Sequence, residues 1–206
     1  MILGLQLLAA YLLGAIPFAY IAGKALRGLD IRQHGSGNVG ATNVFRVLGT
    51  GPGAVVLFLD GAKGWLAAAW LPQLAPQPFP GWAALLGLAA VLGHSYTCFL
   101  GFKGGKGVAT SAGVFLGLAP WATLAVIGVF LLVFLSSRMV SAGSLAAALC
   151  LPPLVWYFNG PGAPVFWLAL VLAVVVWVRH APNIKRILDG TESKFGKPKT
   201  TATEQP

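Results

Sequence analysis

The chain has 206 residues, of which 57% are hydrophobic and only 9% are charged, and its formal net charge is +9. Because an average soluble domain carries about 25% charged residues, this composition excludes a soluble enzyme, a secreted domain and a disordered chain, and it indicates a membrane protein with several spans. In a soluble protein the basic excess would suggest nucleic-acid binding, whereas in a membrane protein it is typical of cytoplasmic loops and implies no nucleic acid.

Seven apolar stretches follow one another along the chain, and a membrane span needs about 20 mostly apolar residues. The first, 2–23, precedes Lys24 and Arg27. A signal peptide begins with basic residues, so we expect a retained helix that Pro17 bends without ending. The other stretches are 53–71, 82–97, 108–119, 121–135, 142–158 and 165–178. We therefore predict an all-α polytopic membrane protein with seven transmembrane helices, of which the fourth and fifth could also form one long tilted helix.

The basic residues orient these helices in the membrane. All Lys and Arg residues except Lys63 fall in four segments, which are 24–52, 98–107, 136–141 and 179–206. Because basic loops stay on the cytoplasmic side, we predict an N-terminus outside and a cytoplasmic C-terminus. Most polar residues share these segments, so we expect the site at the cytoplasmic face. We predict one transmembrane domain over 1–192 and a basic polar tail over 193–206.

The first inner loop alternates glycines with small hydrogen-bonding residues. It contains Ser36, Gly37, Asn38, Gly40, Thr42 and Asn43, and Arg46 follows. Such a loop turns many backbone N–H groups toward one point and forms a cradle for phosphate or an oxyanion, to which Arg46 adds a charged fork. The alternative is a flexible connector or a set of helix caps.

The second inner loop interleaves Lys103 and Lys106 with glycines that include Gly104 and Gly105, just before a predicted helix. Backbone amides, lysine charge and a helix N-terminus would converge there on an anion. The spacing does not fit a Walker A loop, because Gly107 stands where that motif requires Ser or Thr. The alternative is a flexible loop whose charge only sets the topology.

The other polar residues lie in the tail and in two predicted helices. His180 and Asn183 are three apart, so they share a face if the segment is helical, and His180 suits proton transfer or phosphate binding. The alternative for this segment is a basic patch that binds anionic lipid. Asp60 and Lys63 favour a structural ion pair inside the membrane over a catalytic carboxylate. His94 could be a ligand, a base or a hydrogen-bonded interior residue.

These motifs resemble those of the bacterial acyl-phosphate-dependent glycerol-3-phosphate acyltransferases of the PlsY type. The resemblance covers nearly the whole chain and adds Ser141 and Glu192 to the residues named above. The family commonly carries a proline after the glycine–histidine pair, where this chain has Thr97 and Cys98. No His is followed five residues later by Asp, so the dyad of many acyl-CoA-dependent acyltransferases is missing.

The resemblance implies transfer of a fatty acyl group from acyl phosphate to the 1-hydroxyl of sn-glycerol 3-phosphate. The products are 1-acylglycerol 3-phosphate (lysophosphatidic acid) and phosphate, in the first step of bacterial phospholipid synthesis. It also implies a multi-pass protein of the bacterial inner membrane with a cytoplasmic active site, no metal or coenzyme, and a functional link to an enzyme that generates acyl phosphate.

The resemblance also implies residue roles. Those expected to hold glycerol 3-phosphate are Ser36, Arg46, Lys103, Gly104, Gly105 and Lys106. Those expected around the acyl phosphate are Gly37, Asn38, Gly40, Thr42, Asn43, Ser141, His180 and Asn183. The supporting residues are Asp60, Lys63, His94 and Glu192. We expect catalysis from Ser36, Arg46, Lys106, His180 and Asn183, with preorganised donors that stabilise the oxyanion.

Two questions stay open at this point. The base could be the substrate's own phosphate, which we slightly prefer, or His180, whereas a covalent acyl-Ser36 intermediate lacks an evident base. The rival functions are a small transporter for a phosphorylated solute and a non-catalytic lipid-binding protein. Transporters place their sites near the membrane midplane, whereas here only Asp60 and Lys63 lie near it.

Overall fold

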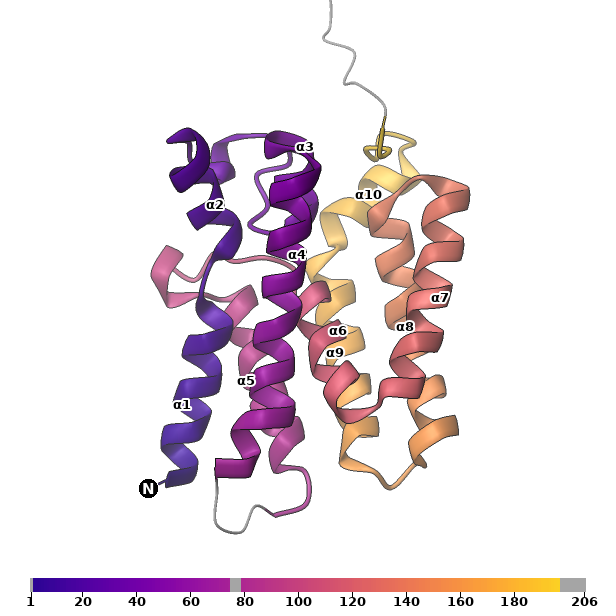
Figure 1. Cartoon of the computed structure of the whole chain (residues 1–206). Coiled ribbons are helices and arrows are strands. Elements are labelled where there is room, and N and C mark those ends of the chain that lie inside the picture. Colours follow the sequence, from indigo (N-terminus) through magenta and orange to yellow (C-terminus); the bar gives the residue numbers. More distant parts are fainter. Residues whose placement is uncertain (1, 75–78, 197–206) are drawn as a thin grey trace, which may run out of the picture.

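The computed structural model describes residues 2–74 and 79–196, and every regular element within these ranges is helical (Figure 1). In chain order they are α1 (Ile2–Ala15), α2 (Phe18–Arg27), η1 (Ile31–Gln33), α3 (Ala41–Leu48), α4 (Thr50–Trp65), η2 (Leu66–Trp70), η3 (Leu71–Leu74), α5 (Trp82–Ser95), η4 (Cys98–Leu100), α6 (Val108–Leu118), α7 (Pro120–Ser137), α8 (Val140–Asn159), α9 (Pro164–Arg179) and α10 (Ala181–Leu188).

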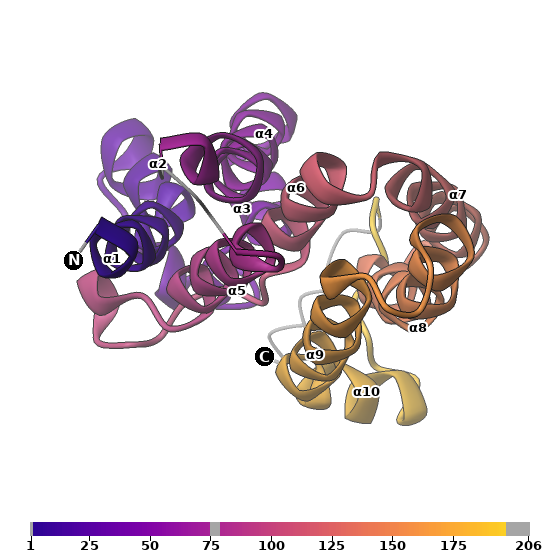
Figure 2. The same cartoon turned by 90° about the horizontal axis from the view of Figure 1, so that it is seen from below.

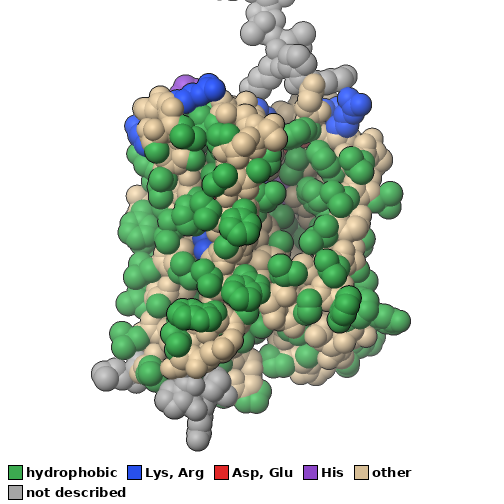
Figure 3. Space-filling model, viewed as in Figure 1, with side chains coloured by type: hydrophobic (Ala, Val, Ile, Leu, Met, Phe, Trp, Pro, Cys, Tyr) green, Lys and Arg blue, Asp and Glu red, His purple; other side chains and the backbone are tan. Residues whose placement is uncertain are grey.

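The helices form two lobes that α6 joins. One lobe contains α1 to α5, and the other contains α7, α8 and α9 (Figure 2). Apolar side chains cover most of the face in Figure 3, and most Lys and Arg side chains gather at the end where α2, α3 and α10 lie. This distribution is what a bilayer demands, because charged groups are costly in hydrocarbon.

The seven predicted apolar stretches all appear as helices, but they differ in length. Within the described residues, four helices are long and apolar enough to cross a membrane, and six are if each of the two bent pairs counts as one span. The remaining helix, α6, has 11 residues and spans about 17 Å. The single long helix considered for 108–135 is wrong, because the chain reverses at Ala119 between α6 and α7.

The prediction that Pro17 bends the first helix without ending it is also wrong. Helix α1 ends at Ala15 and α2 starts at Phe18, with 40° between their axes. Proline lacks an N–H donor and its ring crowds the preceding turn, so the helix stops. The carbonyl of Ile16 accepts a hydrogen bond from Lys63 Nζ at 2.9 Å, which keeps this broken backbone partnered inside the protein.

Glycines let α4 of the first lobe approach α6 closely. A Cβ atom on Gly64 of α4 would overlap the backbone carbonyl of Thr110 in α6, and one on Gly113 would overlap that of Gly61. Such small residues are typical of helix interfaces in membranes, where packing rather than water exclusion drives association. The α4–α6 crossing therefore requires glycine on both helices.

The segment that follows α10 packs against both lobes through Phe195. The ring of Phe195 meets Phe45 of α3 at 6.1 Å and Phe134 of α7 at 5.7 Å, both edge to face. Its backbone N–H donates to the carbonyl of Arg138 at 2.7 Å. Phe195, which lies in the predicted tail, thus contacts α3 and α7, and 197–206 lie outside the described residues.

Gly113→Ala should destabilise the protein by about 1–3 kcal/mol, the usual effect of overpacking. The matched control is Gly128→Ala in α7, where a Cβ atom meets nothing within 4 Å and higher helix propensity should leave stability equal or slightly higher. Thermal unfolding in detergent measures both. Equal melting temperatures for the two variants would show that the α4–α6 crossing tolerates a methyl group.

Candidate active site

A cavity of about 1490 Å³ lies between the two lobes. It brings together most of the predicted site residues, namely Ser36, Gly37, Asn38, Gly40, Thr42, Arg46, Asp60, His94, Lys106, Ser141, His180, Asn183 and Glu192. Its basic residues come from the two glycine-rich loops and the segment around α10. The rest of the wall is mainly apolar and comes from α4 and α6 to α9, with a few polar side chains such as Asp60, Ser111, Thr123 and Ser144. Five predicted site residues, Asn43, Lys63, Lys103, Gly104 and Gly105, do not line it.

The first glycine-rich loop owes its shape to Asn43. Its Oδ1 accepts a hydrogen bond from the backbone N–H of Ser36 at 2.8 Å. Its Nδ2 donates to the carbonyls of Ile31 at 3.1 Å and His34 at 3.0 Å. Gly35 has a positive φ of 64°, and a side chain there would collide with Asn43. Asn43 therefore holds the loop from behind, while Ser36 and the glycines face the cavity.

The second glycine-rich loop is fixed from both sides. The N–H groups of Gly104 and Gly105 donate to the carbonyls of Ser95 and His94, each at 3.1 Å. On the other side, Arg179 Nη2 donates to the carbonyls of Gly104 at 3.0 Å and Gly105 at 2.9 Å. With the loop held in this way, Lys106 lines the cavity, whereas Lys103 is exposed.

The clamping role of Arg179 was not predicted from the sequence. Its signal was a basic residue directly before His180, which fitted positive-inside topology equally well.

Thr97 lies where this chain departs from the family by lacking a proline, and hydrogen bonds hold the backbone there. Thr97 Oγ1 donates to the carbonyl of Ala15 at 2.6 Å and accepts from the N–H of Phe99 at 3.3 Å, so the chain is held without a proline.

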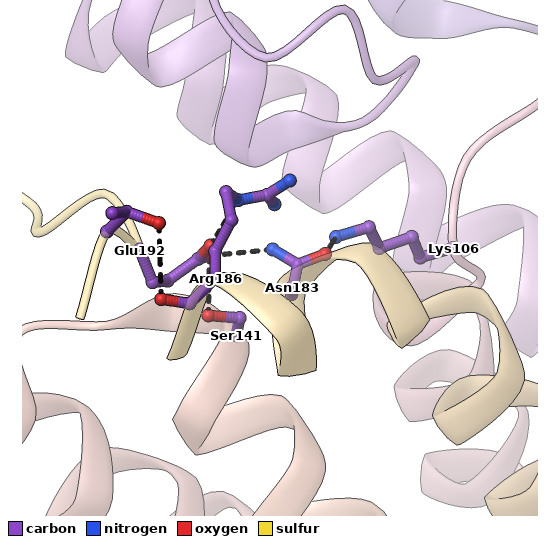
Figure 4. Close-up of polar contacts among 6 residues, drawn as sticks. Lys106, Ser141, Asn183, Arg186 and Glu192 are labelled. Carbon is purple, nitrogen blue, oxygen red and sulfur yellow. Dashed lines mark hydrogen bonds and ion pairs between the residues drawn. The ribbon is translucent and has the colours of Figure 1, made fainter. Parts of the chain in front are cut away.

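Glu192 gathers three donors around its carboxylate (Figure 4). Oε1 accepts hydrogen bonds from Ser141 Oγ at 2.7 Å and Asn183 Nδ2 at 2.6 Å, and Oε2 accepts from Arg186 Nε at 2.7 Å. Asn183 in turn accepts a hydrogen bond from Lys106 Nζ through its Oδ1. The carboxylate thereby fixes which end of the Asn183 amide faces Lys106.

Burial and neighbouring charges set the protonation states. Burial, together with the nearby Arg186, Arg179 and Arg46, lowers the pKa of Lys106 to about 8 despite Glu192. Burial and the charge of Lys106 lower the pKa of His180, between α9 and α10, to about 4. Burial alone would raise the pKa of Glu192, but hydrogen bonds from Ser141, Asn183 and Arg186 outweigh it and lower that pKa.

At neutral pH the site therefore holds a cationic Lys106, a neutral His180 and an anionic Glu192. His180 Nδ1 lies 2.8 Å from the carbonyl of Val176. Because a carbonyl only accepts, we assign the proton to Nδ1, which leaves Nε2 as an acceptor. This ring can accept a hydrogen bond from a substrate hydroxyl but carries no charge.

Asp60 and Lys63 form the predicted ion pair, with 2.8 Å between Oδ1 and Nζ. Both side chains are 2% exposed, and His94 Nδ1 lies 3.5 Å from the same carboxylate oxygen. Lys63 reaches away from the cavity to the helix break at Ile16. This cluster ties α4, α5 and the first span together beneath the loops.

The chain is similar to known proteins over nearly its whole length. The glycerol-3-phosphate acyltransferase family profile matches residues 4–190. Glycerol-3-phosphate acyltransferase of Thermosynechococcus vestitus is 48% identical to this chain, and the match covers 95% of this chain and 96% of that protein. Glycerol-3-phosphate acyltransferase of Halalkalibacterium halodurans is 44% identical, and the match covers 96% of this chain and 97% of that protein.

Two solved structures are also similar. One is PlsY, an integral membrane glycerol 3-phosphate acyltransferase, in its glycerol 3-phosphate form, with a TM-score of 0.86 and 40% identity over 94% of this chain and 96% of that one. The other is the lysophosphatidic acid form of PlsY, with a TM-score of 0.83 and 39% identity over 94% of this chain and 95% of that one. The chain therefore belongs to the PlsY family of integral membrane glycerol-3-phosphate acyltransferases.

Proposed function

We propose that the protein transfers a fatty acyl group from acyl phosphate to the 1-hydroxyl of sn-glycerol 3-phosphate and releases lysophosphatidic acid and phosphate. The observation that carries this proposal is the cavity itself, because its cationic and glycine-rich end suits phosphate groups and its apolar wall suits an acyl chain. The family and the two ligand forms of the solved relatives support the acceptor and the product.

Ser36, Arg46 and Lys106 would hold the phosphate of glycerol 3-phosphate. All three line the cavity, and charged hydrogen bonds from Arg and Lys to phosphate are among the strongest that proteins form. Gly104 and Gly105 would act indirectly, by carrying Lys106 on the clamped loop. Lys103 would contribute only to the basic surface.

The acyl phosphate would lie against Gly37, Asn38, Gly40 and Thr42, with Asn183 and His180 beside the reacting carbonyl. Asn43 and Ser141 would position this site, since Asn43 bonds the first loop and Ser141 bonds Glu192. Fixed donors near the carbonyl oxygen would stabilise the developing oxyanion. Phosphate is a good leaving group, so positioning and charge neutralisation would supply most of the catalysis.

In the transfer step the 1-hydroxyl oxygen bonds to the acyl carbon, the bond from that carbon to the phosphate oxygen breaks, and phosphate leaves. The hydroxyl proton would pass to a substrate phosphate, whose second pKa of about 6 lies above that of His180, about 4. Neutral His180 would accept a hydrogen bond from the hydroxyl and orient it.

We further propose an N-terminus outside and a C-terminus in the cytoplasm of a bacterial inner membrane, with α6 as the short member of seven membrane helices. The distribution of Lys and Arg supports this orientation. Acyl phosphate would come from a partner enzyme that generates it, and the product would enter phospholipid synthesis.

The donor is tested directly with the purified protein in lipid or detergent. Palmitoyl phosphate should release phosphate only when glycerol 3-phosphate is present, with equal formation of lysophosphatidic acid, and palmitoyl-CoA should give no product. Phosphate release and product formation are measured in parallel. Transfer from palmitoyl-CoA would contradict the proposed donor, and absence of transfer from both would favour transport.

The two lysines of the second loop provide a matched pair. Lys106→Met should lower kcat/KM for glycerol 3-phosphate roughly 10- to 100-fold, because a hydrogen bond to a charged group contributes about 1.5–3 kcal/mol. Lys103→Met removes the same charge outside the cavity and should change kcat/KM less than about threefold, as for an exposed charge. Equal losses would show that the loop acts through its overall charge.

The pH dependence of kcat/KM for glycerol 3-phosphate tests the proton path. Activity should fall as pH rises through about 8, where Lys106 loses its proton. It should fall below about 6, where the dianionic substrate phosphate takes up a proton and becomes a monoanion. His180→Gln should lower the rate and keep the acid limb, whereas an acid limb near 4 that disappears in this variant would identify His180 as the base.

A further inference from the structure

The apolar part of the cavity is lined by side chains whose size changes along three of its helices. On α6, α8 and α9 small side chains lie nearer the polar end than large ones, whereas on α7 the order is reversed, from Thr123 far in to Phe130 near the polar end. The small residues are Gly113 on α6, Ala147 and Ala148 on α8, and Ala173 on α9. The large residues are Phe115 on α6, Leu151 on α8 and Leu172 on α9. On each helix the large residue lies on the side away from the polar end of the molecule (Figure 1).

The three large residues also belong to the solid core of the second lobe. Phe115, Leu151 and Leu172 are 1%, 8% and 1% exposed and pack in one cluster with Val155 and Leu168. Val155 and Leu168 do not line the cavity. The cavity therefore meets this cluster at Phe115, Leu151 and Leu172, which form its floor together with Thr123 of α7, another lining residue.

The depth of this space matches the length of a membrane lipid chain. Along α8, the ten residues from Ser141 in the polar network to Leu151 in the floor cover about 15 Å. Half of a bilayer's hydrocarbon core, the thickness that one layer of acyl chains fills, is also about 15 Å.

The wall between the lobes provides a path from the bilayer into this space. Phe58 and Trp65 of α4 and Leu131 of α7 line the cavity and are 72%, 41% and 45% exposed. Figure 3 shows the surface hollowed between the lobes on this side. A chain could enter sideways there and still meet the closed floor.

We propose that Phe115, Leu151 and Leu172 set the upper limit on the length of the acyl chain that the enzyme transfers. The inference rests on the proposed function and adds a specificity to it. Each methylene buried above the floor should raise kcat/KM roughly fourfold. A longer chain would have to displace side chains of a close-packed core, which is unfavourable.

The test measures kcat/KM with lauroyl, myristoyl, palmitoyl, stearoyl and arachidoyl phosphates in the full-length protein. Leu172→Ala lowers the floor, so the ratio of arachidoyl to palmitoyl transfer should rise about tenfold, the value of one to two extra buried methylenes. Ala148→Leu fills the space above the floor, so the preference should move toward lauroyl phosphate.

Leu168→Ala is the matched control, because Leu168 lies one turn from Leu172 in the same helix and core cluster but outside the cavity. It should lower stability without moving the preferred chain length. If Leu172→Ala does not fold, Ala148→Leu decides the question alone.

The outcomes separate the two proposals. A wild-type protein that transfers no acyl phosphate of any length refutes the proposed function. The wild type could instead be active while its chain-length profile stays unchanged in Leu172→Ala and Ala148→Leu, or shifts equally in Leu168→Ala. Either result would contradict the proposal that Phe115, Leu151 and Leu172 limit chain length. In that case the chain would lie in the open path between α4 and α7.

Discussion

The carboxylate of Glu192 connects parts of the chain that are far apart in sequence. It accepts hydrogen bonds from Ser141 at the start of α8 and from Asn183 and Arg186 on α10, and Asn183 then meets Lys106 from the loop before α6. This anion opposes the effect of burial on Lys106, whose pKa burial lowers and the charge of Glu192 raises. The arrangement of side chains at the polar end of the cavity follows from this contact.

The same physical requirement explains the polar residues that do not face the cavity. Asn43 satisfies the backbone of the first loop, Arg179 satisfies the carbonyls of the second, and Lys63 satisfies the carbonyl freed at the helix break. Each keeps irregular backbone partnered by groups of the protein itself. Phe195 adds an apolar contact that holds the segment after α10 across both lobes.

The cavity suits molecules that are charged at one end and apolar at the other. Its cationic end lies near the polar surface of the molecule, and its apolar part descends between α6, α7, α8 and α9 onto the packed core. On α6, α8 and α9 the small lining residues lie nearer the polar end, and the large ones lie farther from it. In the proposed function, one space would thereby hold a phosphate group and a hydrocarbon chain at the same time.

The features that depend on local composition could be predicted from the sequence. Hydropathy gave the apolar helices, because each must bury its own backbone in lipid. Glycine spacing gave the two loops, and the motifs around Ser36, Lys106 and His180 gave the family. The Asp60–Lys63 ion pair was also predictable, because three residues of helix separate its partners.

The orientation of the side chains in these motifs depends on tertiary contacts and could not be predicted from the sequence. Asn43 and Lys103 lie in motifs that looked like binding loops, yet one turns back into its loop and the other faces outward. The clamp by Arg179, the full break at Pro17, the packed Phe195 and the floor of the cavity were not predictable either. Each depends on contacts between residues distant in sequence, and local composition carries no information about which distant group will provide the partner.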